Sequence, residues 1–345
     1  MKRILGFLLL ALTWGVETQA QDQSGGLIQP LKCTLGTDCW IPNYVDLKRG
    51  NGVLDYKCLD ASYDAEPGGF HKGTDFALRD MKAVAKGVDV VAAAAGTVIG
   101  ARDGLKDEKY HEHGDSHADE GHTHDVKGQE CGNGVRIKHD SGLVSQYCHL
   151  RQNSVKIKAG QTVEQGDVLG LVGLSGQTAF PHLHFQVSQG EMVLDPFVGL
   201  SRQKSCGAGE KPLWTAETLE ALPYKPTAIF NTGFSPEEPK RDAMMSGTYQ
   251  DYETEGFPAK APVMIAWAEM FRVRPNDRLE IIMHEPGGEV FLHQIAPIKA
   301  AKAYQYLYVG KRLKGEAWPT GTYKVRFELK SGLESEVVER TFDVR

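Results

Sequence analysis

Four short segments of the sequence contain side chains that together could form a metal-dependent hydrolytic centre. The segments are His71-Lys72-Gly73-Thr74-Asp75, Tyr147-Cys148-His149-Leu150, Ser175-Gly176-Gln177-Thr178 and Pro181-His182-Leu183-His184-Phe185. They supply imidazoles and a carboxylate, which are nitrogen and oxygen ligands that suit zinc. Three protein ligands leave one coordination position for water, and two further imidazoles could transfer protons. The combination predicts a hydrolase that activates water with a metal ion.

The spacing within two segments indicates how each could contribute. A histidine and a carboxylate four residues apart, with the flexible Gly73 between them, can turn back onto one cation. On a strand, His182 and His184 point to one face, and the origins of their side chains lie roughly 6–7 Å apart. This separation suits two ligands of one metal, or one ligand beside one catalytic base, and spacing alone leaves both alternatives open.

The elements that must position these residues are short strands. From residue 69 to residue 198, β-branched runs alternate with glycine turns and helical periodicity is scarce. The expected strands include Val88–Ala95, Gly96–Gly100, Val135–His139, Val144–His149, Val168–Val172 and His182–Val187. Regular alternation would place His149 on the same face of its strand as Tyr147. We therefore expect an all-β protein in which an antiparallel sheet carries the candidate site.

Taken in order, these segments resemble the lysostaphin-like (LytM, M23) family of zinc metallopeptidases over about residues 69–198. The features that match, besides the three histidine-containing motifs, are Ala95–Val98, Gly132–Ile137 and Gly160–Asp167. The resemblance implies a LytM-type antiparallel catalytic domain. It also implies a zinc metalloendopeptidase, with peptidoglycan peptide cross-links or another peptide as the substrate.

The resemblance further implies a role for each candidate residue. In this family the first histidine, the aspartate and the last histidine bind zinc, which corresponds to His71, Asp75 and His184. The catalytic pair corresponds to His149 and His182, which would assist a zinc-activated water. Which of the two is the base and which stabilises the oxyanion stays open. The alternative function is a non-catalytic LytM-type protein that binds cell wall or activates another hydrolase, although all five positions are filled here.

Four positions depart from the family pattern. Cys148 occupies the variable position of Tyr-x-His and Cys131 precedes the Gly-Asn-Gly turn, which suggests that disulfides brace the strands of the site. Phe180 stands where relatives often carry smaller residues, so we expect it to narrow or reshape the cleft. Gln186 replaces an acidic residue that follows His-x-His-Phe, with no clear catalytic consequence.

The N-terminus is typical of a secretory signal peptide, which we assign to residues 1–20. Lys2 and Arg3 precede an apolar run from Ile4 to Val16, and small residues suitable for cleavage follow. We therefore expect an exported protein, periplasmic or secreted, without a transmembrane segment after cleavage.

Export favours disulfides among the six cysteines. Cys33 and Cys39 are the easiest local pair. The remaining cysteines, which allow three pairings, are Cys58, Cys131, Cys148 and Cys206.

The chain of 345 residues is long enough for two domains. We expect residues 21–68 to form an irregular lead-in tied down by cysteines, before the peptidase domain at 69–198. Residues 199–226 are expected to form a linker or a strap back onto the first domain. Residues 227–345 then form a C-terminal domain that resembles an immunoglobulin-like β-sandwich.

Within the C-terminal domain, Ala300–Val309 could be a short helix or another strand. The expected strands are Thr227–Asn231, Val263–Phe271, Arg278–His284, Val290–Ile295, Gly321–Leu329 and Ser335–Val344. The candidate core aromatics are Trp267, Trp318, Tyr323 and Phe327. The sequence indicates no partner for this domain.

A histidine- and acid-rich insertion, at residues 106–130, interrupts the predicted peptidase domain. Its central part has almost no apolar residue, so we expect a solvated loop. The loop could be a weak auxiliary site that recruits metal to the centre, or a solvated segment without that role. A metal-buffering protein that uses this tract is a third functional class. The net charge of −6 gives no general attraction to nucleic acid or anionic lipid.

Overall fold

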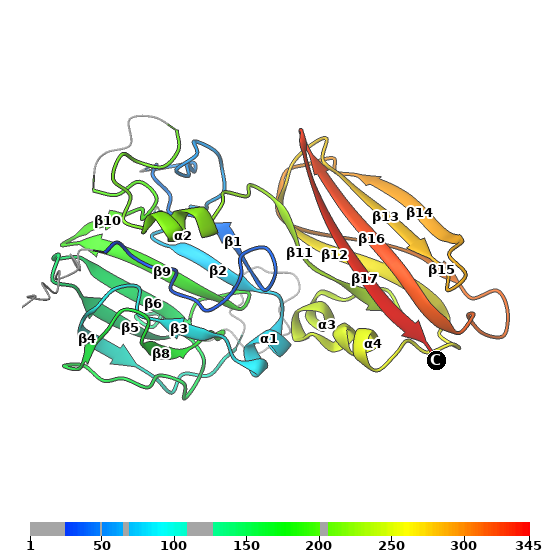
Figure 1. Ribbon diagram of the computed structural model, residues 1–345, viewed down its shortest axis with the longest axis horizontal. Coiled ribbons are helices and arrows are strands. Elements are labelled where there is room, and N and C mark those ends of the chain that lie inside the picture. The colour runs from blue at the N-terminus through cyan, green and yellow to red at the C-terminus, as the bar shows by residue number, and fades with distance from the viewer. Residues whose placement is uncertain (1–24, 49, 65–68, 109–126, 201–205) are drawn as a thin grey trace, which may run out of the picture.

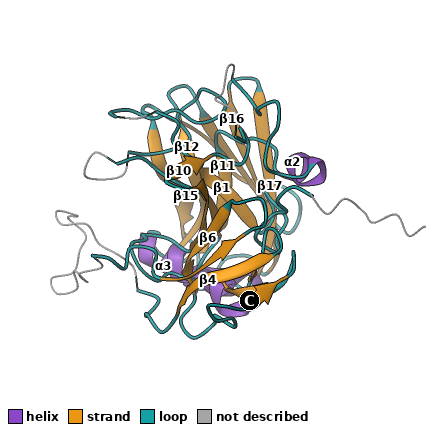
Figure 2. Ribbon diagram, turned by 90° about the vertical axis from the view of Figure 1, so that its left-hand side faces the viewer, coloured by secondary structure: helices purple, strands orange, loops and turns teal. Residues whose placement is uncertain are grey.

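The computed structural model describes residues 25–48, 50–64, 69–108, 127–200 and 206–345. The predicted signal peptide and most of the histidine-rich insertion lie outside these ranges. Figure 1 shows two β-rich bodies side by side, the first coloured blue to green and the second yellow to red. Within the described ranges, no helix has the length and apolar character needed to cross a membrane. The predominance of strands confirms the expected all-β fold (Figure 2).

The first body is built on an eight-stranded antiparallel sheet with the order β1-β2-β9-β6-β5-β4-β7, and β10 pairs with β9. Its strands are β1 (Cys39–Asn43), β2 (Thr74–Leu78), β4 (Gly96–Arg102), β5 (Asn133–Lys138), β6 (Val144–Leu150), β7 (Thr162–Val163), β9 (His182–Gln189) and β10 (Met192–Leu194). A separate pair consists of β3 (Asp89–Val91) and β8 (Val168–Leu171), and α1 spans Met81–Lys86.

Alternation along β9 divides the sheet into a core face and a site face. Leu183, Phe185 and Val187 are fully buried in the hydrophobic core. His182 and His184, at the intervening positions, point to the opposite face. Burying each apolar side chain contributes about 1.5–3 kcal/mol, so the core holds this strand in one orientation.

The segment predicted to be an irregular lead-in is partly regular and belongs to the first body. Its residues 39–43 form β1, which pairs antiparallel with β2 at the edge of the sheet. Leu27, Leu31 and Tyr44 are buried in the same core as the main sheet. The expectation of an irregular segment was wrong here because turn-rich composition hides a five-residue strand.

Residues 206–226 pack back onto the first body, as the strap alternative describes. The segment includes α2 (Ala216–Ala221), whose first turn is capped by the Thr215 side chain. Trp214 is buried against the rings of Phe185 and Phe197, with centroid distances of 5.5 and 5.8 Å.

The second body is a sandwich of two antiparallel sheets, as predicted for the C-terminal domain. One sheet contains β11 (Ala228–Ser235), β12 (Val263–Val273) and β15 (Lys302–Arg312). The other has the order β14 (Val290–Pro297), β13 (Arg278–His284), β16 (Gly321–Ser331) and β17 (Glu334–Val344). Of the two alternatives for Ala300–Val309, the strand is the one observed, in β15.

Of the four candidate core aromatics, Trp318, Tyr323 and Phe327 are buried in the main core of the sandwich. Trp267 is also buried, but in a separate cluster with Met244 and Tyr249. The sequence analysis did not predict the short helices between β11 and β12. They are α3 (Arg241–Ser246), a 3-10 turn η1 (Thr248–Gln250) and α4 (Asp251–Thr254). Each spans at most six residues, too few for helical periodicity to stand out in the sequence.

All six cysteines form disulfides. The predicted Cys33–Cys39 bond is present. Of the three open pairings, the structure has Cys58–Cys206 and Cys131–Cys148. The first of these ties the strap to the N-terminal segment, and the second joins Cys131, which lies two residues before β5, to β6.

The two bodies contact each other through apolar and charged side chains. Trp40 of β1 packs with Phe230 and Phe271 of the sandwich. Lys82 of α1 forms an ion pair with Asp251 of α4.

Removing the Cys58–Cys206 disulfide should destabilise the protein more than removing Cys33–Cys39. The bonds join residues separated by 148 and 6 positions, and stabilisation grows with the length of the closed loop. The chain-entropy description gives about 5 kcal/mol for the long loop and about 2 kcal/mol for the short one. Denaturant unfolding of the two double Cys→Ala variants measures both losses. Equal losses would contradict the role assigned to the long-range bond.

Candidate active site

The register of β2 on β9 places two of the predicted metal ligands directly opposite each other. Asp75 and His184 are paired Cα positions, and Asp75 Oδ1 lies 2.9 Å from His184 Nδ1. His71 immediately precedes β2, and its Nε2 lies 3.1 Å from both of those atoms. Three side chains from two strands and a loop therefore direct one atom each toward a common point.

This group of three donors fits a zinc ion. The described residues His71, Asp75 and His184 form a cluster whose ligand atoms all lie within 4.8 Å of one another. Zinc bonds of about 2.0–2.2 Å in a tetrahedron would separate ligand atoms by about 3.3–3.6 Å. The observed separations of 2.9–3.1 Å are slightly smaller, so a bound ion would require only a small outward movement.

Groups behind the three donors fix their orientation. His71 Nδ1 lies 2.7 Å from the carbonyl oxygen of Tyr44, which can only accept a hydrogen bond. Nδ1 therefore carries the proton, and Nε2 presents a lone pair to the cluster. The amide of Asn43 donates to Asp75 Oδ2 at 2.8 Å, which leaves Oδ1 for the cluster. Such hydrogen bonds behind metal ligands set both orientation and affinity.

His149 reaches the same face of the sheet through a β-bulge. Between β5 and β6 the register moves from Val135–Tyr147 to Asn133–Leu150, so β6 has one extra residue. His149 has φ of 64°, a left-handed conformation that is rare for a residue with a Cβ. The expectation that His149 and Tyr147 share a face was wrong, because this conformation interrupts the alternation.

The rings of these two residues lie on opposite sides of the sheet. Tyr147 packs against Phe185 on the core face, with a centroid distance of 5.3 Å. The His149 ring instead lies 4.7 Å from that of His182 on the site face. The bulge thus brings together the two histidines that the sequence analysis assigned to catalysis.

Carbonyl oxygens also fix the proton positions of these two imidazoles. His149 Nδ1 donates to the Ser175 carbonyl oxygen at 2.8 Å. His182 Nδ1 donates to the Phe180 carbonyl oxygen at 3.0 Å and also lies 3.0 Å from Thr178 Oγ1. In the neutral form, Nε2 of each ring is therefore unprotonated and able to accept a proton.

Burial and neighbouring charges determine the protonation of the site. Burial alone would raise the pKa of Asp75, but His71, His182 and His184 hold it well below its usual range. Burial, with His182 and His184 nearby, lowers the pKa of His149 well below its usual range. Burial also lowers the pKa of His182, and Asp75 offsets part of this effect. At neutral pH the site thus combines the ionised Asp75 carboxylate with neutral imidazoles of His149 and His182.

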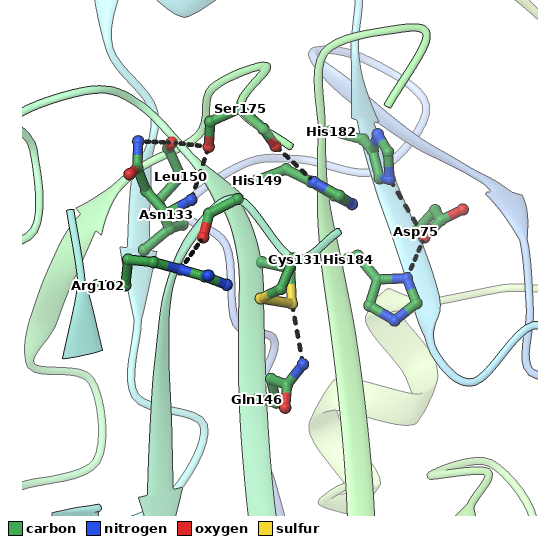
Figure 3. The surroundings of a disulfide bond; sticks show 12 residues. Asp75, Arg102, Cys131, Asn133, Gln146, His149, Leu150, Ser175, His182 and His184 are labelled. Carbon is green, nitrogen blue, oxygen red and sulfur yellow. Dashed lines mark hydrogen bonds and ion pairs between the residues drawn. A yellow bond between two sulfur atoms is a disulfide. The ribbon is translucent and has the colours of Figure 1, made fainter. Parts of the chain in front are cut away.

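The Cys131–Cys148 disulfide lies beside the bulge (Figure 3). Cys148 is paired with His184 across β6 and β9, and the Cys131 carbonyl accepts a hydrogen bond from the His149 amide at 2.8 Å. The Ser175 hydroxyl accepts a hydrogen bond from the backbone amide of Asn133 and donates one to the Leu150 carbonyl. The disulfide therefore braces the strands of the site, as the positions of the two cysteines suggested.

Phe180 lies against one of the candidate catalytic histidines. Its ring stacks on that of His182 with a centroid distance of 4.5 Å and an interplanar angle of 25°. Phe180 therefore contacts His182 directly, and its effect on the shape of the cleft stays a prediction.

The structure brings all five predicted site residues together, with His149 and His182 next to the donor cluster. Sequence reasoning missed Asn43, the Tyr44 carbonyl and Tyr63, whose ring stacks on His71 at 4.4 Å. All three belong to the segment predicted to be irregular. A carbonyl oxygen leaves no trace in the sequence, and no local motif marks the other two positions.

Comparisons with known proteins find a family that matches part of this chain. Residues 69–196 match Peptidase family M23. The cell division protein DipM of Caulobacter vibrioides is 42% identical over 64 residues, which are 19% of this chain and 10% of DipM. The peptidoglycan DD-endopeptidase ShyB of Vibrio cholerae is 32% identical over 90 residues, which are 26% of this chain and 21% of ShyB.

The similar regions are short. The matches span between 10% and 21% of the length of the first three curated relatives. Among solved structures, the catalytic domain of lysostaphin from Staphylococcus simulans is 22% identical. That match covers 43% of this chain and 86% of the lysostaphin domain, with a TM-score of 0.27. The family match and the named relatives confirm the resemblance seen in the motifs: residues 69–196 match peptidase family M23.

Proposed function

We propose that this protein is an exported zinc metalloendopeptidase that hydrolyses peptide cross-links of peptidoglycan. The observation that carries the proposal is the convergence of three metal-ligand atoms beside two neutral imidazoles. Relatives named as peptidoglycan DD-endopeptidases support the substrate class. The signal-like N-terminus and three disulfides support export.

His71, Asp75 and His184 would hold the zinc ion through Nε2, Oδ1 and Nδ1. A zinc ion held by three protein ligands supplies Lewis acidity and lowers the pKa of water. The Tyr44 carbonyl and the Asn43 amide keep two of these ligands in position. An ionised Asp75 and an unprotonated His71 Nε2 are the forms that bind a cation.

His149 and His182 would move the protons of the reaction. Hydrolysis requires one proton to leave the attacking water and one to reach the departing amine. Each imidazole has Nδ1 bonded to a carbonyl oxygen, which leaves Nε2 to accept and return a proton. His182 Nε2 lies 3.5 Å from Asp75 Oδ1, so this carboxylate faces the nitrogen that carries the proton. When protonated, either Nε2 could donate a hydrogen bond to the oxyanion that forms at the peptide carbonyl.

Alanine substitutions should separate the two groups of residues. Changing His71, Asp75 or His184 should abolish both zinc binding and activity, because each removes a ligand. Changing His149 or His182 should reduce activity by about 10²–10⁴-fold while most of the zinc remains bound. Metal analysis and peptidase assays of the purified variants measure the two effects. Loss of zinc from the His149→Ala or His182→Ala variant would overturn this division.

Gly73→Ala should weaken zinc binding without unfolding the protein. A Cβ atom at residue 73 would lie 2.6 Å from His184 Nε2 and 2.7 Å from the Phe185 carbonyl oxygen, so the ligand ring must shift. We expect a loss of zinc affinity of about tenfold or more, as for other disturbances behind metal ligands. Gly100→Ala is the matched control, because a Cβ atom there meets nothing within 4 Å. Equal affinities of the two variants would contradict the assigned packing.

Digestion of purified peptidoglycan tests the proposed activity directly. The full-length protein should cut peptide cross-links, and mass spectrometry of the products should show one water added at each cut bond. A chelator should stop the reaction, and added zinc should restore it. Intact cross-links despite binding of the protein to peptidoglycan would instead favour the non-catalytic, wall-binding or hydrolase-activating alternative.

A further inference from the structure

One side chain of the C-terminal domain reaches into the segments that support the metal ligands. Arg272, on β12, donates from Nε to the Pro42 carbonyl at 2.7 Å and from Nη1 to the Asp60 carbonyl at 2.7 Å. Its Nη2 donates to the Ser62 carbonyl at 2.6 Å and also to Asn43 Oδ1. One guanidinium therefore joins two N-terminal segments that are separate in sequence.

The first of these segments contacts the candidate metal ligands directly, and the second reaches them through the Tyr44 carbonyl. Asn43 donates to Asp75, and the carbonyl of Tyr44 accepts from His71. The hydroxyl of Ser62 donates to that same Tyr44 carbonyl at 2.7 Å. Arg272 thus lies one hydrogen-bonding residue away from Asp75, at the end of a continuous path Arg272–Asn43–Asp75.

The two hydrogen bonds of Asn43 fix which end of its side-chain amide faces Asp75. A side-chain amide has one accepting and one donating end. Because the Asn43 oxygen accepts from Arg272, its nitrogen faces the carboxylate of Asp75. A flipped amide would place its oxygen against the Asp75 carboxylate and its nitrogen against the guanidinium, and both contacts would be repulsive. Arg272 therefore selects the amide orientation that supports Asp75.

The backbone shows that this placement has an energetic cost. Arg272 has φ of 50°, in the left-handed region that residues with a Cβ rarely adopt. Such a conformation costs about 1–3 kcal/mol and persists only where surrounding contacts impose it. On the other side of the interface, a register shift between Trp40 and Asn43 brings Asn43 opposite Asp75. The left-handed backbone of Arg272 and the register shift between Trp40 and Asn43 therefore lie at the same contact between the domains.

We propose that Arg272 is a positioning residue through which the C-terminal domain holds the metal-binding group of the peptidase domain in its binding geometry. The inference rests on the proposed zinc site. It gives the C-terminal domain a role in the peptidase centre that the family match, at residues 69–196, does not include.

The test compares zinc affinity in full-length variants, measured by competition with a chromophoric chelator. Arg272→Gln and Arg272→Lys should each bind zinc about 10- to 100-fold more weakly than the unmodified protein. The lysine variant keeps the charge but cannot reach four acceptors at once, so charge alone should not rescue binding. The Co²⁺-loaded variants should also show an altered visible absorption spectrum, which reports the ligand geometry.

Arg274→Gln is the matched control. Arg274 pairs with the Asp60 side chain at the same domain interface, and none of its described contacts is with Asn43. Its loss should leave zinc affinity and the Co²⁺ spectrum unchanged. Equal weakening in the Arg272 and Arg274 variants would show a general effect of the interface and would overturn the proposal.

A double-mutant cycle with Asn43→Ala tests the path itself. If Arg272 acts through Asn43, the double variant should lose less affinity than the product of the two single losses. Independent losses that multiply would contradict the path. Circular dichroism shows whether the Arg272 variants fold. If neither does, the zinc affinity of Asn43→Ala decides alone, because this substitution leaves the three carbonyl contacts of Arg272 in place. Unchanged affinity in that variant would then overturn the proposal.

The outcomes also separate this inference from the proposed function. An unmodified protein that binds no zinc would contradict the proposed function, and this inference with it. An unmodified protein that binds zinc, together with folded Arg272 variants of equal affinity, would contradict this inference alone.

Discussion

The pairing of β2 with β9 is the constraint on which the rest of the site depends. Phe76, Leu183 and Phe185 are buried on one face of these strands, and this packing fixes their register. With that register, Asp75 and His184 must face each other on the opposite side. A slip by one residue would move the apolar side chains into solvent and the ligands into the core. The packing of the hydrophobic core therefore positions the candidate metal-binding atoms.

The sequence predicted the parts of the site that follow from regular strand geometry. Alternation placed His182 and His184 on one face, and the family resemblance assigned their roles. His149 could be identified but not oriented, because the bulge and the left-handed backbone that turn its ring are irregularities without a local sequence signal. The pairing of the four remaining cysteines depended on long-range contacts, which spacing does not encode. The same holds for Asn43 and Arg272, which are separated by 229 positions.

The hydrogen bonds that orient the site residues come from two sources, backbone carbonyls and one side-chain amide. Carbonyl oxygens of Tyr44, Ser175 and Phe180 set the proton positions of three imidazoles. Because backbone carbonyls bind the rings, these contacts depend on the path of the chain and tolerate many side chains at the same positions. The Asn43 amide is the exception, since its contact with Asp75 is made by a side chain and needs a partner to orient it. The C-terminal domain supplies that partner.

The position of β1 has a consequence for the extent of the candidate site. The family match begins at residue 69, yet Asn43 of β1, which donates to the second oxygen of Asp75, and Tyr44, whose carbonyl accepts the proton of His71, both lie before it. A fragment cut at the family limits would keep every residue of the motif and lose the neighbours that orient two of them. The smallest fragment that keeps the whole candidate site is therefore longer than the region that matches the family, and it begins upstream of the first candidate ligand.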